Sequence, residues 1–493
     1  MGNGNSTKNE VAPGLAKNKV TLWGMIALSI AGIFLYGYAY ATAGGFIDTA
    51  GRAAIYVGVL GAAVVLLASI PILEYARLVK FAGGYYGLAE LGFGKAVGKF
   101  TALLNYLYYN FWQAGNSLIT AMLMNVGYYI ITGSMPPIWL FFVFAIVTAT
   151  VMYIGAITEV SLETKVILIS VIIQVIVVLA SALYVIFRSP YNSLVFLNPN
   201  SGPGGFRGIA LGASIAGFLT FIGYGNPLFY SEEGAAARKT VWKAIIISVL
   251  LTLLIGSISI YSELVALPNI NTVASSPIPL LTAYRPYFGT IGLFFFWALF
   301  IPFYYTSIIG GAGSQARLLY AMARDKFFKS KWLSELHPKR RVPVHAALVN
   351  YIIALLLIIA ISIALFSIYG YNETSMFYAA FATFTTAVIL WYFHHFIPDI
   401  SLYFYIQKHK IKVSLVRKII TAVITPAFGV IIFSYAFYAG IVSSLVEPYF
   451  SFVILGLLIA VFAAIYVVYK AKRGELGESV VHYFAAEAAR GEE

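Results

Sequence analysis

The chain has 493 residues, of which 60% are hydrophobic and 10% are charged, and its mean hydropathy is +0.85. Soluble domains carry about a quarter of charged residues, so this composition excludes a water-soluble globular protein. The absence of cysteine from the sequence excludes disulfides, thiolate metal sites and cysteine nucleophiles. The formal net charge of +13 would indicate nucleic-acid binding only if the basic residues gathered on one surface.

Apolar runs long enough to cross a bilayer dominate the sequence. A helix of about twenty residues spans the hydrocarbon core, and the sequence contains twelve such runs. We therefore expect an all-α polytopic membrane protein with twelve transmembrane helices. In chain order, the predicted spans lie near residues 22–46, 54–79, 99–130, 137–157, 164–187, 208–231, 242–267, 288–322, 344–368, 376–397, 417–443 and 449–470. The charged tail, residues 471–493, is expected to be disordered or to lie on the surface.

Lysine and arginine orient the predicted bundle. When the N-terminal segment, residues 1–21, is placed in the cytoplasm, all but four of the 32 basic residues fall on the cytoplasmic side. The four exceptions are Arg52, Arg188, Arg207 and Arg285. This asymmetry predicts a multi-pass protein of the cell membrane with both termini in the cytoplasm. Topology thus explains the positive charge, and no nucleic-acid partner is predicted.

Two of the predicted spans are interrupted. The sixth, which ends in FLTFIGYGNPLFYSEE (residues 218–233), is broken around Gly223 and Gly225, and Asn226 places an amide at mid-membrane depth. The first is interrupted at Gly32. Backbone groups freed in lipid cost several kcal/mol each unless protein or a water-filled cavity satisfies them. Paired breaks in corresponding helices therefore indicate the substrate site of a transporter.

Polar side chains form a stripe along the third predicted span. Their spacing of three or four residues places them on one helix face; they are Asn105, Tyr109, Gln113, Asn116 and Thr120. Amides that point into lipid are costly, so the stripe is expected to face the bundle interior. It serves either to line a pathway or to bond neighbouring helices. We predict substrate contacts for Gln113 and Asn116.

Other polar residues suggest roles in ion coupling and gating. Thr306 and Ser307 place adjacent hydroxyls in the eighth predicted span, where they either help coordinate a hard cation such as sodium or bond back to the helix backbone. Proton coupling is equally open. Acidic residues at inner helix ends, together with a nearby arginine, are candidates for cytoplasmic gate salt bridges: Glu74, Glu232, Glu233 and Arg317.

Histidine and aspartate do not indicate a cofactor or a metal. His394 and His395 are adjacent, so they point in different directions and make a poor haem or metal pair at the inner end of the tenth predicted span. A membrane transferase would need clustered aspartates, and the three in this chain, Asp48, Asp325 and Asp399, lie far apart. Rings of charge typical of a channel are not evident. We therefore predict a transporter and not an enzyme, with no cofactor and no metal.

Three sequence blocks resemble the amino acid–polyamine–organocation permeases. EYARLVKFAGGYYGLAELGFG (Glu74–Gly94) resembles the family pattern E-L-A-x-x-x-P-x-A-G-G-x-Y followed by F-G. The broken sixth span is similar to F-x-A-F-x-G-F-E-x5-A-E-E through Phe218, Phe221, Gly223, Glu232 and Glu233. Arg317–Pro343 is similar to S-R-x-x-Y-A-M-A-R-D-G…H-P-x4-P. The blocks occur in the family's order along the chain.

The resemblance implies a LeuT-like fold with two inverted five-helix repeats. Residues 22–397 would form this ten-helix transport core, with helices 1 and 6 broken, and residues 398–470 would add helices 11 and 12. Half-helix N-termini would receive a substrate carboxylate, and unwound carbonyls would receive an ammonium. A Thr/Ser pair on the eighth helix contributes to a sodium site in related transporters. The main-chain site implied is Ile30, Ala31, Gly32, Ile33, Phe221, Ile222, Gly223, Tyr224 and Gly225.

One departure from the family pattern bears on the substrate. Gly225 stands where the family commonly has a glutamate, and the predicted core spans show almost no charge. A cationic cargo would be desolvated without an anion to meet it, so neutral amino acids are favoured. Polyamines or other organic cations are the alternative. An ion gradient (Na⁺ or H⁺) or counter-exchange is expected to drive transport, in a monomer or homodimer surrounded by lipid, since no nucleotide-binding motif occurs.

Overall fold

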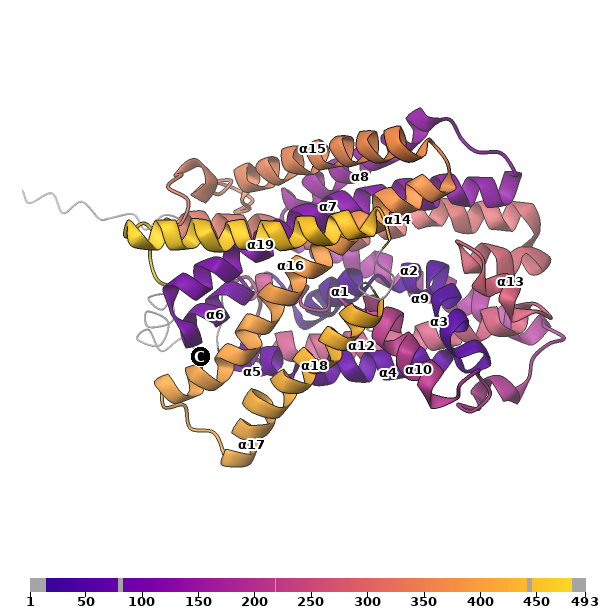
Figure 1. Cartoon of the computed structure of the whole chain (residues 1–493), viewed down its shortest axis with the longest axis horizontal. Helices are drawn as coiled ribbons and strands as arrows, with labels where there is room; N and C mark the ends of the chain where they lie inside the picture. Colours follow the sequence, from indigo (N-terminus) through magenta and orange to yellow (C-terminus); the bar gives the residue numbers. More distant parts are fainter. Residues whose placement is uncertain (1–14, 79–82, 218, 441–445, 481–493) are drawn as a thin grey trace, which may run out of the picture.

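The computed structural model describes residues 15–78, 83–217, 219–440 and 446–480. All regular structure in these residues is helical (Figure 1), which confirms the expected all-α class. Residues 1–14 of the N-terminal segment, 481–493 of the tail, and the motif positions Ala82 and Phe218 lie outside the described residues.

The helices follow one another along the whole described chain. Those of the first half are α1 (Leu22–Ile33), α2 (Leu35–Ala41), α3 (Ala43–Ala50), α4 (Ile55–Ala68), α5 (Ile70–Leu78), α6 (Tyr85–Phe93), α7 (Lys95–Thr132), α8 (Ile138–Ala156), α9 (Val160–Arg188), α10 (Phe206–Gly212) and α11 (Asn226–Phe229). Those of the second half are α12 (Ala237–Ala266), α13 (Ile270–Ala274), α14 (Pro279–Arg324), α15 (Val344–Tyr369), α16 (Glu373–Lys408), α17 (Leu415–Ile419), α18 (Thr425–Gly440) and α19 (Tyr449–Lys472).

Among the described helices, nine are long and apolar enough to cross a membrane. A tenth candidate is the bent pair Ala43–Ala53 and Ile55–Ala68, whose halves meet at 110°. The polar-striped helix α7 and the broken segment from α10 to α11 are not among these candidates. The structure thus has many apolar helices, and the number of twelve spans stays a prediction.

The first helix break lies between α1 and α2. Phe34 adopts a left-handed backbone conformation with φ 62°, and its N–H donates to the carbonyl oxygens of Ile30 (2.8 Å) and Ala31 (3.1 Å). A left-handed conformation costs a non-glycine residue roughly 1–2 kcal/mol. Edge-on contacts of the Phe34 ring with Tyr304 (4.6 Å) and Phe300 (5.7 Å) help to offset that cost. Aromatic packing around Phe34 therefore stabilises the break.

The second helix break lies between α10 and α11. A π turn (Ala213–Gly217) and a 3₁₀ turn (Leu219–Phe221) follow α10, and Gly223 then takes φ 104°. This segment crosses the first break at backbone contact: a Cβ on Gly32 would lie 2.1 Å from the carbonyl oxygen of Gly223, and one on Gly223 would lie 2.2 Å from that of Gly32. Only a pair of glycines permits this crossing.

The long helices surround this crossing. The first helix α1 packs against α9, α12 and α14, while α7 packs against α16, α14, α8 and α6. In Figure 1, α19 runs across α16, with which it is in contact, and α17 and α18 form the lower edge of the view. The α16 helix continues through Pro398 to Lys408, beyond the predicted end of the tenth span at residue 397. A proline inside a helix has no N–H, so the carbonyl group four residues earlier loses its helical donor.

The described part of the C-terminal tail lies on the surface formed by α6 and the end of α14. Glu90 Oε1 accepts hydrogen bonds from the Ser479 hydroxyl (2.6 Å) and the Val480 N–H (3.0 Å). Lys329 Nζ pairs with Glu475 Oε1 at 2.9 Å, and this hydrogen bond lowers the pKa of Glu475 below its usual range. The tail was expected either to be disordered or to lie on the surface, and its described residues lie on the surface.

The glycine crossing can be tested by comparing two glycines with positive φ. At Gly94, with φ 91°, an added Cβ would meet no atom within 4 Å, whereas one at Gly223 would meet Gly32. We expect Gly94→Ala to cost about 1–2 kcal/mol from backbone strain, and Gly223→Ala to cost about 1–3 kcal/mol more from the clash. Apparent melting temperatures of the purified variants, followed by tryptophan fluorescence, measure this difference. Equal shifts for the two variants would contradict the backbone contact.

Candidate functional site

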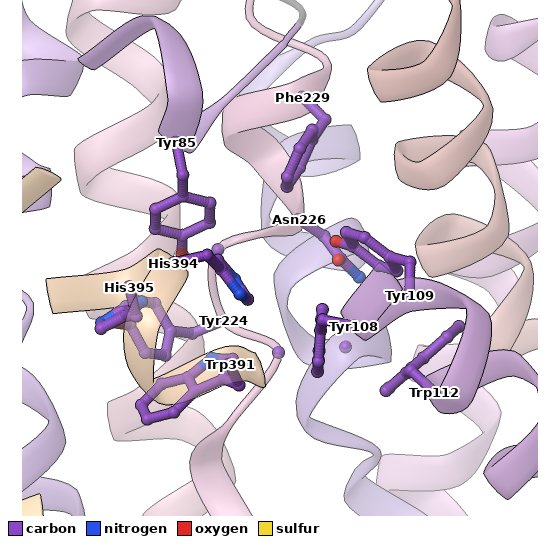
Figure 2. A pocket seen from close by; sticks show the side chains of 13 residues that line it. Tyr85, Tyr108, Tyr109, Trp112, Tyr224, Asn226, Phe229, Trp391, His394 and His395 are labelled. Atoms are coloured by element: carbon purple, nitrogen blue, oxygen red, sulfur yellow. The ribbon is translucent and has the colours of Figure 1, made fainter. Parts of the chain in front are cut away.

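A cavity lies where the two helix breaks cross. It is small and partly open, and it is drawn in Figure 2. The breaks, α6, α7, α11 and α16 all contribute to its wall. The lining residues are Gly32, Tyr85, Tyr108, Tyr109, Trp112, Gly223, Tyr224, Gly225, Asn226, Phe229, Trp391, His394 and His395.

Aromatic side chains from α7 and α16 face each other across the cavity. Figure 2 shows Tyr108 and Trp112 on the α7 side, with Trp391 and His395 on the α16 side. The rings of Trp391 and His395 are stacked with centroids 4.4 Å apart, and Tyr108 lies 4.9 Å from the ring of His394. The faces of such rings attract a cation, so this part of the wall suits an amine.

The broken backbone forms the third side of the cavity. Gly32, Gly223 and Gly225 have no side chain, so main-chain groups come close to the enclosed space. The Tyr224 hydroxyl lies 3.2 Å from His395 Nε2, and the Tyr224 carbonyl oxygen accepts a hydrogen bond from the Ser29 hydroxyl at 3.0 Å. Polar backbone next to aromatic faces can hold a small molecule that combines charged and apolar groups.

Four of the predicted main-chain residues meet at this cavity: Gly32, Gly223, Tyr224 and Gly225. The remaining predicted residues lie around it. Ile30, Ala31 and Ile33 are buried in α1, and Ile222 is partly buried. Phe221 is fully buried and packs edge-on against Tyr38, with centroids 5.8 Å apart.

The predicted contacts on α7 lie beyond the cavity-lining part of that helix. Gln113 is buried, and Asn116 Nδ2 donates to the Trp112 carbonyl oxygen at 2.6 Å. The Tyr304 hydroxyl of α14 donates to Asn116 Oδ1. Asn116 therefore joins two helices, while Tyr109 of the same stripe lines the cavity.

The hydroxyl pair on α14 bonds to its own helix and to α9. Thr306 and Ser307 each donate to the carbonyl oxygen of Phe303, at 3.0 Å and 2.9 Å. The Thr306 hydroxyl also bonds the Ser170 hydroxyl, which accepts from Gln174 Nε2 at 3.1 Å. A chain of polar groups thus runs from α14 through α9 toward the first break, where Gln174 Oε1 accepts from the Tyr36 N–H at 3.1 Å.

The predicted gate residues form ion pairs below the cavity. Arg317 Nη2 donates to Glu233 Oε1 at 3.1 Å, Arg317 Nε donates to Glu233 Oε2, and both side chains are fully buried. The N–H groups of Lys19 and Val20 donate to the Glu233 carbonyl oxygen at 2.8 Å and 3.0 Å. These bonds tie α14 to the segment after α11 and to the segment before α1.

The other two predicted gate residues are also paired. Glu232 faces Arg324 at 3.1 Å, and Glu74 faces Arg417 at 2.6 Å. Each of the three predicted carboxylates therefore meets an arginine from a helix distant in sequence.

Several lining residues were not predicted from the sequence. His394 and His395 were predicted at the inner end of the tenth span without a role, but α16 continues to Lys408 and both rings are buried against the cavity. The available signal was the spacing of Trp391 and His395, which places the two rings on one helix face. Other unpredicted lining residues are Tyr85, Tyr108, Trp112 and Phe229.

The predicted core spans contain few charged residues, but the helices of the structure extend beyond those spans. Buried carboxyl groups lie in three long helices: Glu163 in α9, Glu263 in α12 and Asp399 in α16. The Glu163 carboxylate accepts a hydrogen bond from the Tyr230 hydroxyl. The sequence argument for an uncharged cargo therefore loses its premise. In the described residues, no group of three or more His, Asp or Glu side chains could hold a metal ion.

Comparison with known proteins identifies relatives. A sequence model of the amino acid permease family matches residues 20–469. The chain is 26% identical over 299 residues to the low-affinity putrescine importer PlaP of Escherichia coli strain K12, and equally to PlaP of Escherichia coli O157:H7. The matched region covers 58% of this chain and 63% of the importer, so it spans less than two thirds of that relative.

The family match extends from the start of α1 nearly to the end of α19. It confirms the resemblance found in the three sequence blocks. Because a permease moves its solute without altering it, the match also confirms that the chain is a transporter and not an enzyme. Together with the many apolar helices, it makes the chain a multi-pass membrane protein. The chain belongs to the amino acid permease family.

Proposed function

We propose that this permease is a secondary active transporter that carries amino acids or related small amines by alternating access. The observation that carries this proposal is the cavity at the crossing of two helix breaks. Broken helices place free main-chain donors and acceptors at mid-membrane depth, where a substrate can use them. The membrane would be the cell membrane, with both termini in the cytoplasm.

The proposed architecture has twelve helices and a LeuT-like inverted repeat. The two breaks support it, since they fall in the first and sixth of the predicted spans, which would be the first helices of the two repeats. In this arrangement α15 and α16 complete the ten-helix core, and α18 and α19 are the two additional helices. The repeats would rock against each other around the fixed cavity.

The ion pairs below the cavity are proposed as the closed cytoplasmic gate. Breaking a buried pair such as Arg317–Glu233 leaves uncompensated charge and costs roughly 3–5 kcal/mol. The gate can therefore open only if other interactions, including those with the substrate, are stronger in the open state. This makes opening depend on what the cavity holds.

Two substrate classes are candidates, and the cavity suits both. Neutral amino acids fit the main-chain groups, and organic amines fit the aromatic wall; the putrescine importer is a relative with a cargo of the second class. Coupling to Na⁺ through Thr306 and Ser307, coupling to H⁺, and counter-exchange are proposed drives. The protein would act as a monomer or homodimer in lipid.

A substitution that fills the cavity should stop transport. Gly225 has an ordinary helical conformation (φ −79°), so it accepts a side chain without backbone strain, and its Cβ would meet only the Tyr85 hydroxyl closely, at 2.4 Å. We expect Gly225→Leu to lower uptake of labelled alanine and putrescine into liposomes at least about tenfold, equivalent to about 1.4 kcal/mol.

The matched control is Gly45→Leu. Gly45 is an exposed residue of α3 whose Cβ would have only ordinary contact with Ala216, at 3.8 Å. This variant should retain uptake within about twofold, a change below about 0.5 kcal/mol. Unimpaired uptake by a monodisperse Gly225→Leu protein would exclude the cavity as the substrate site.

The proposed orientation can be tested with single cysteines, since the sequence has none. Asn200 and Lys339 are both exposed and lie on opposite sides in the predicted topology. In intact cells, a membrane-impermeant maleimide should label Asn200→Cys and should label Lys339→Cys only after permeabilisation. The reverse pattern would invert the topology.

A further inference from the structure

One buried carboxyl group near the cavity has no partner. Asp399 of α16 is 0% exposed, and both of its carboxylate oxygens lack a hydrogen-bond partner in the described part of the chain. A buried carboxylate is stable only when it is protonated or when it faces a cation. The position therefore requires either a proton or a positively charged group.

Asp399 lies behind the α16 wall of the cavity. It follows His395 by four residues, so the two side chains lie on one helix face. His395 in turn contacts two phenols that line the cavity: its ring centroid lies 5.2 Å from that of Tyr85, and its Nε2 lies 3.2 Å from the Tyr224 hydroxyl. The Tyr75 hydroxyl bonds the hydroxyl of Ser401, two residues after Asp399, at 2.6 Å. These phenols come from α6, the second break and α5. The groups that face Asp399 from these elements are therefore neutral.

Two other polar groups of α16 lie within five residues of Asp399 in the sequence. Pro398 has no N–H, so the carbonyl of His394 lacks its usual helical donor. His395 Nδ1 is buried and has no hydrogen-bond partner among the described residues. The position thus offers a carboxylate and a freed carbonyl to a group that carries several N–H donors.

We propose that Asp399, with the His394 carbonyl and the rings of Tyr85 and His395, forms a subsite for the ammonium group of an alkylamine cargo. The inference rests on the proposed transport function and names the residue that selects a cationic cargo. An ammonium has three donors and no acceptor, which matches this set. The ring faces around it favour an organic cation. A zwitterionic amino acid without a charged side chain would use the main-chain groups at the breaks and leave Asp399 protonated.

The test compares Asp399→Asn with a matched control, Glu263→Gln. Glu263 is likewise 0% exposed with an unpartnered oxygen, but it lies in α12, which contributes no residue to the cavity wall, whereas α16 contributes three. Wild type and both variants are purified and reconstituted in liposomes, and uptake of labelled putrescine and labelled alanine is measured. Thermal shifts with each compound report binding separately from transport. Size-exclusion profiles and circular dichroism establish that each variant is folded.

The expected result is selective. Asp399→Asn should lower putrescine uptake at least about tenfold and abolish the thermal shift with putrescine, while alanine uptake stays within about twofold. Glu263→Gln should retain wild-type uptake of both. If wild type carries putrescine alone, loss in Asp399→Asn with retention in Glu263→Gln supports the subsite equally.

The contrary outcomes separate the two proposals. Wild-type transport of alanine but not putrescine, or equal putrescine uptake by Asp399→Asn and wild type, would overturn the subsite and leave the transport function standing. Loss of both substrates in a folded Asp399→Asn protein would show a general role and would also overturn selectivity. If wild type neither transports nor binds either compound, the proposed function fails and the subsite fails with it.

Discussion

The contact between two backbones at Gly32 and Gly223 is the constraint on which the site depends. A Cβ on either residue would lie about 2 Å from a carbonyl oxygen of the other segment, so both chains must be bare there. The first segment leaves the helical conformation two residues after the crossing, at Phe34, and the second does so at Gly223 itself, so main-chain groups are freed in the middle of the bundle. Ser29 and Asn226 satisfy some of them, through Tyr224 and Leu28. At the cavity, a bound cargo can form the hydrogen bonds with freed main-chain groups that water would form in a soluble protein.

The same two segments also carry the cytoplasmic closure. The chain before α1 bonds Glu233, which follows the second break, and Glu233 pairs with Arg317 of α14. Val20 lies 12 residues before Gly32, and Glu233 lies 10 residues after Gly223. Movement of either broken segment can therefore be transmitted along the chain to the ion pair. Burial makes this pair costly to open. The cavity and the gate are thus coupled because the same two backbone segments contribute to both. No long series of side-chain contacts between the two sites is needed.

The sequence predicts those features that lipid dictates directly. Apolar runs must form helices in a bilayer, and interrupted runs must be satisfied by protein or cavity, so the helices and the break at Gly223 were predictable. The break predicted at Gly32 lies two residues further on, at Phe34, because Gly32 itself stays helical. The residues of the cavity wall were harder to predict. Tyr85, Trp112 and Trp391 come from three helices, and packing between the helices determines which face of each helix points to the cavity. The place of the histidines in the cavity wall was not predicted, because the predicted tenth span stopped at residue 397 whereas α16 continues to Lys408.

The buried carboxyl groups show most clearly why a sequence motif alone does not predict the charge of the site. Gly225 in place of a glutamate indicated a site without an anion, but a neighbouring helix can supply the carboxyl group that one segment lacks. In the described core, most buried carboxyl groups already have partners: Glu74, Glu90, Glu163, Glu233 and Asp325 face arginine, lysine or tyrosine. Glu263 has only a long contact of 3.5 Å with Ser259, and Asp399 has none. Asp399 is the one of these two beside the cavity, so the charge that the cargo meets depends on the contacts between helices and not on the motif at the break.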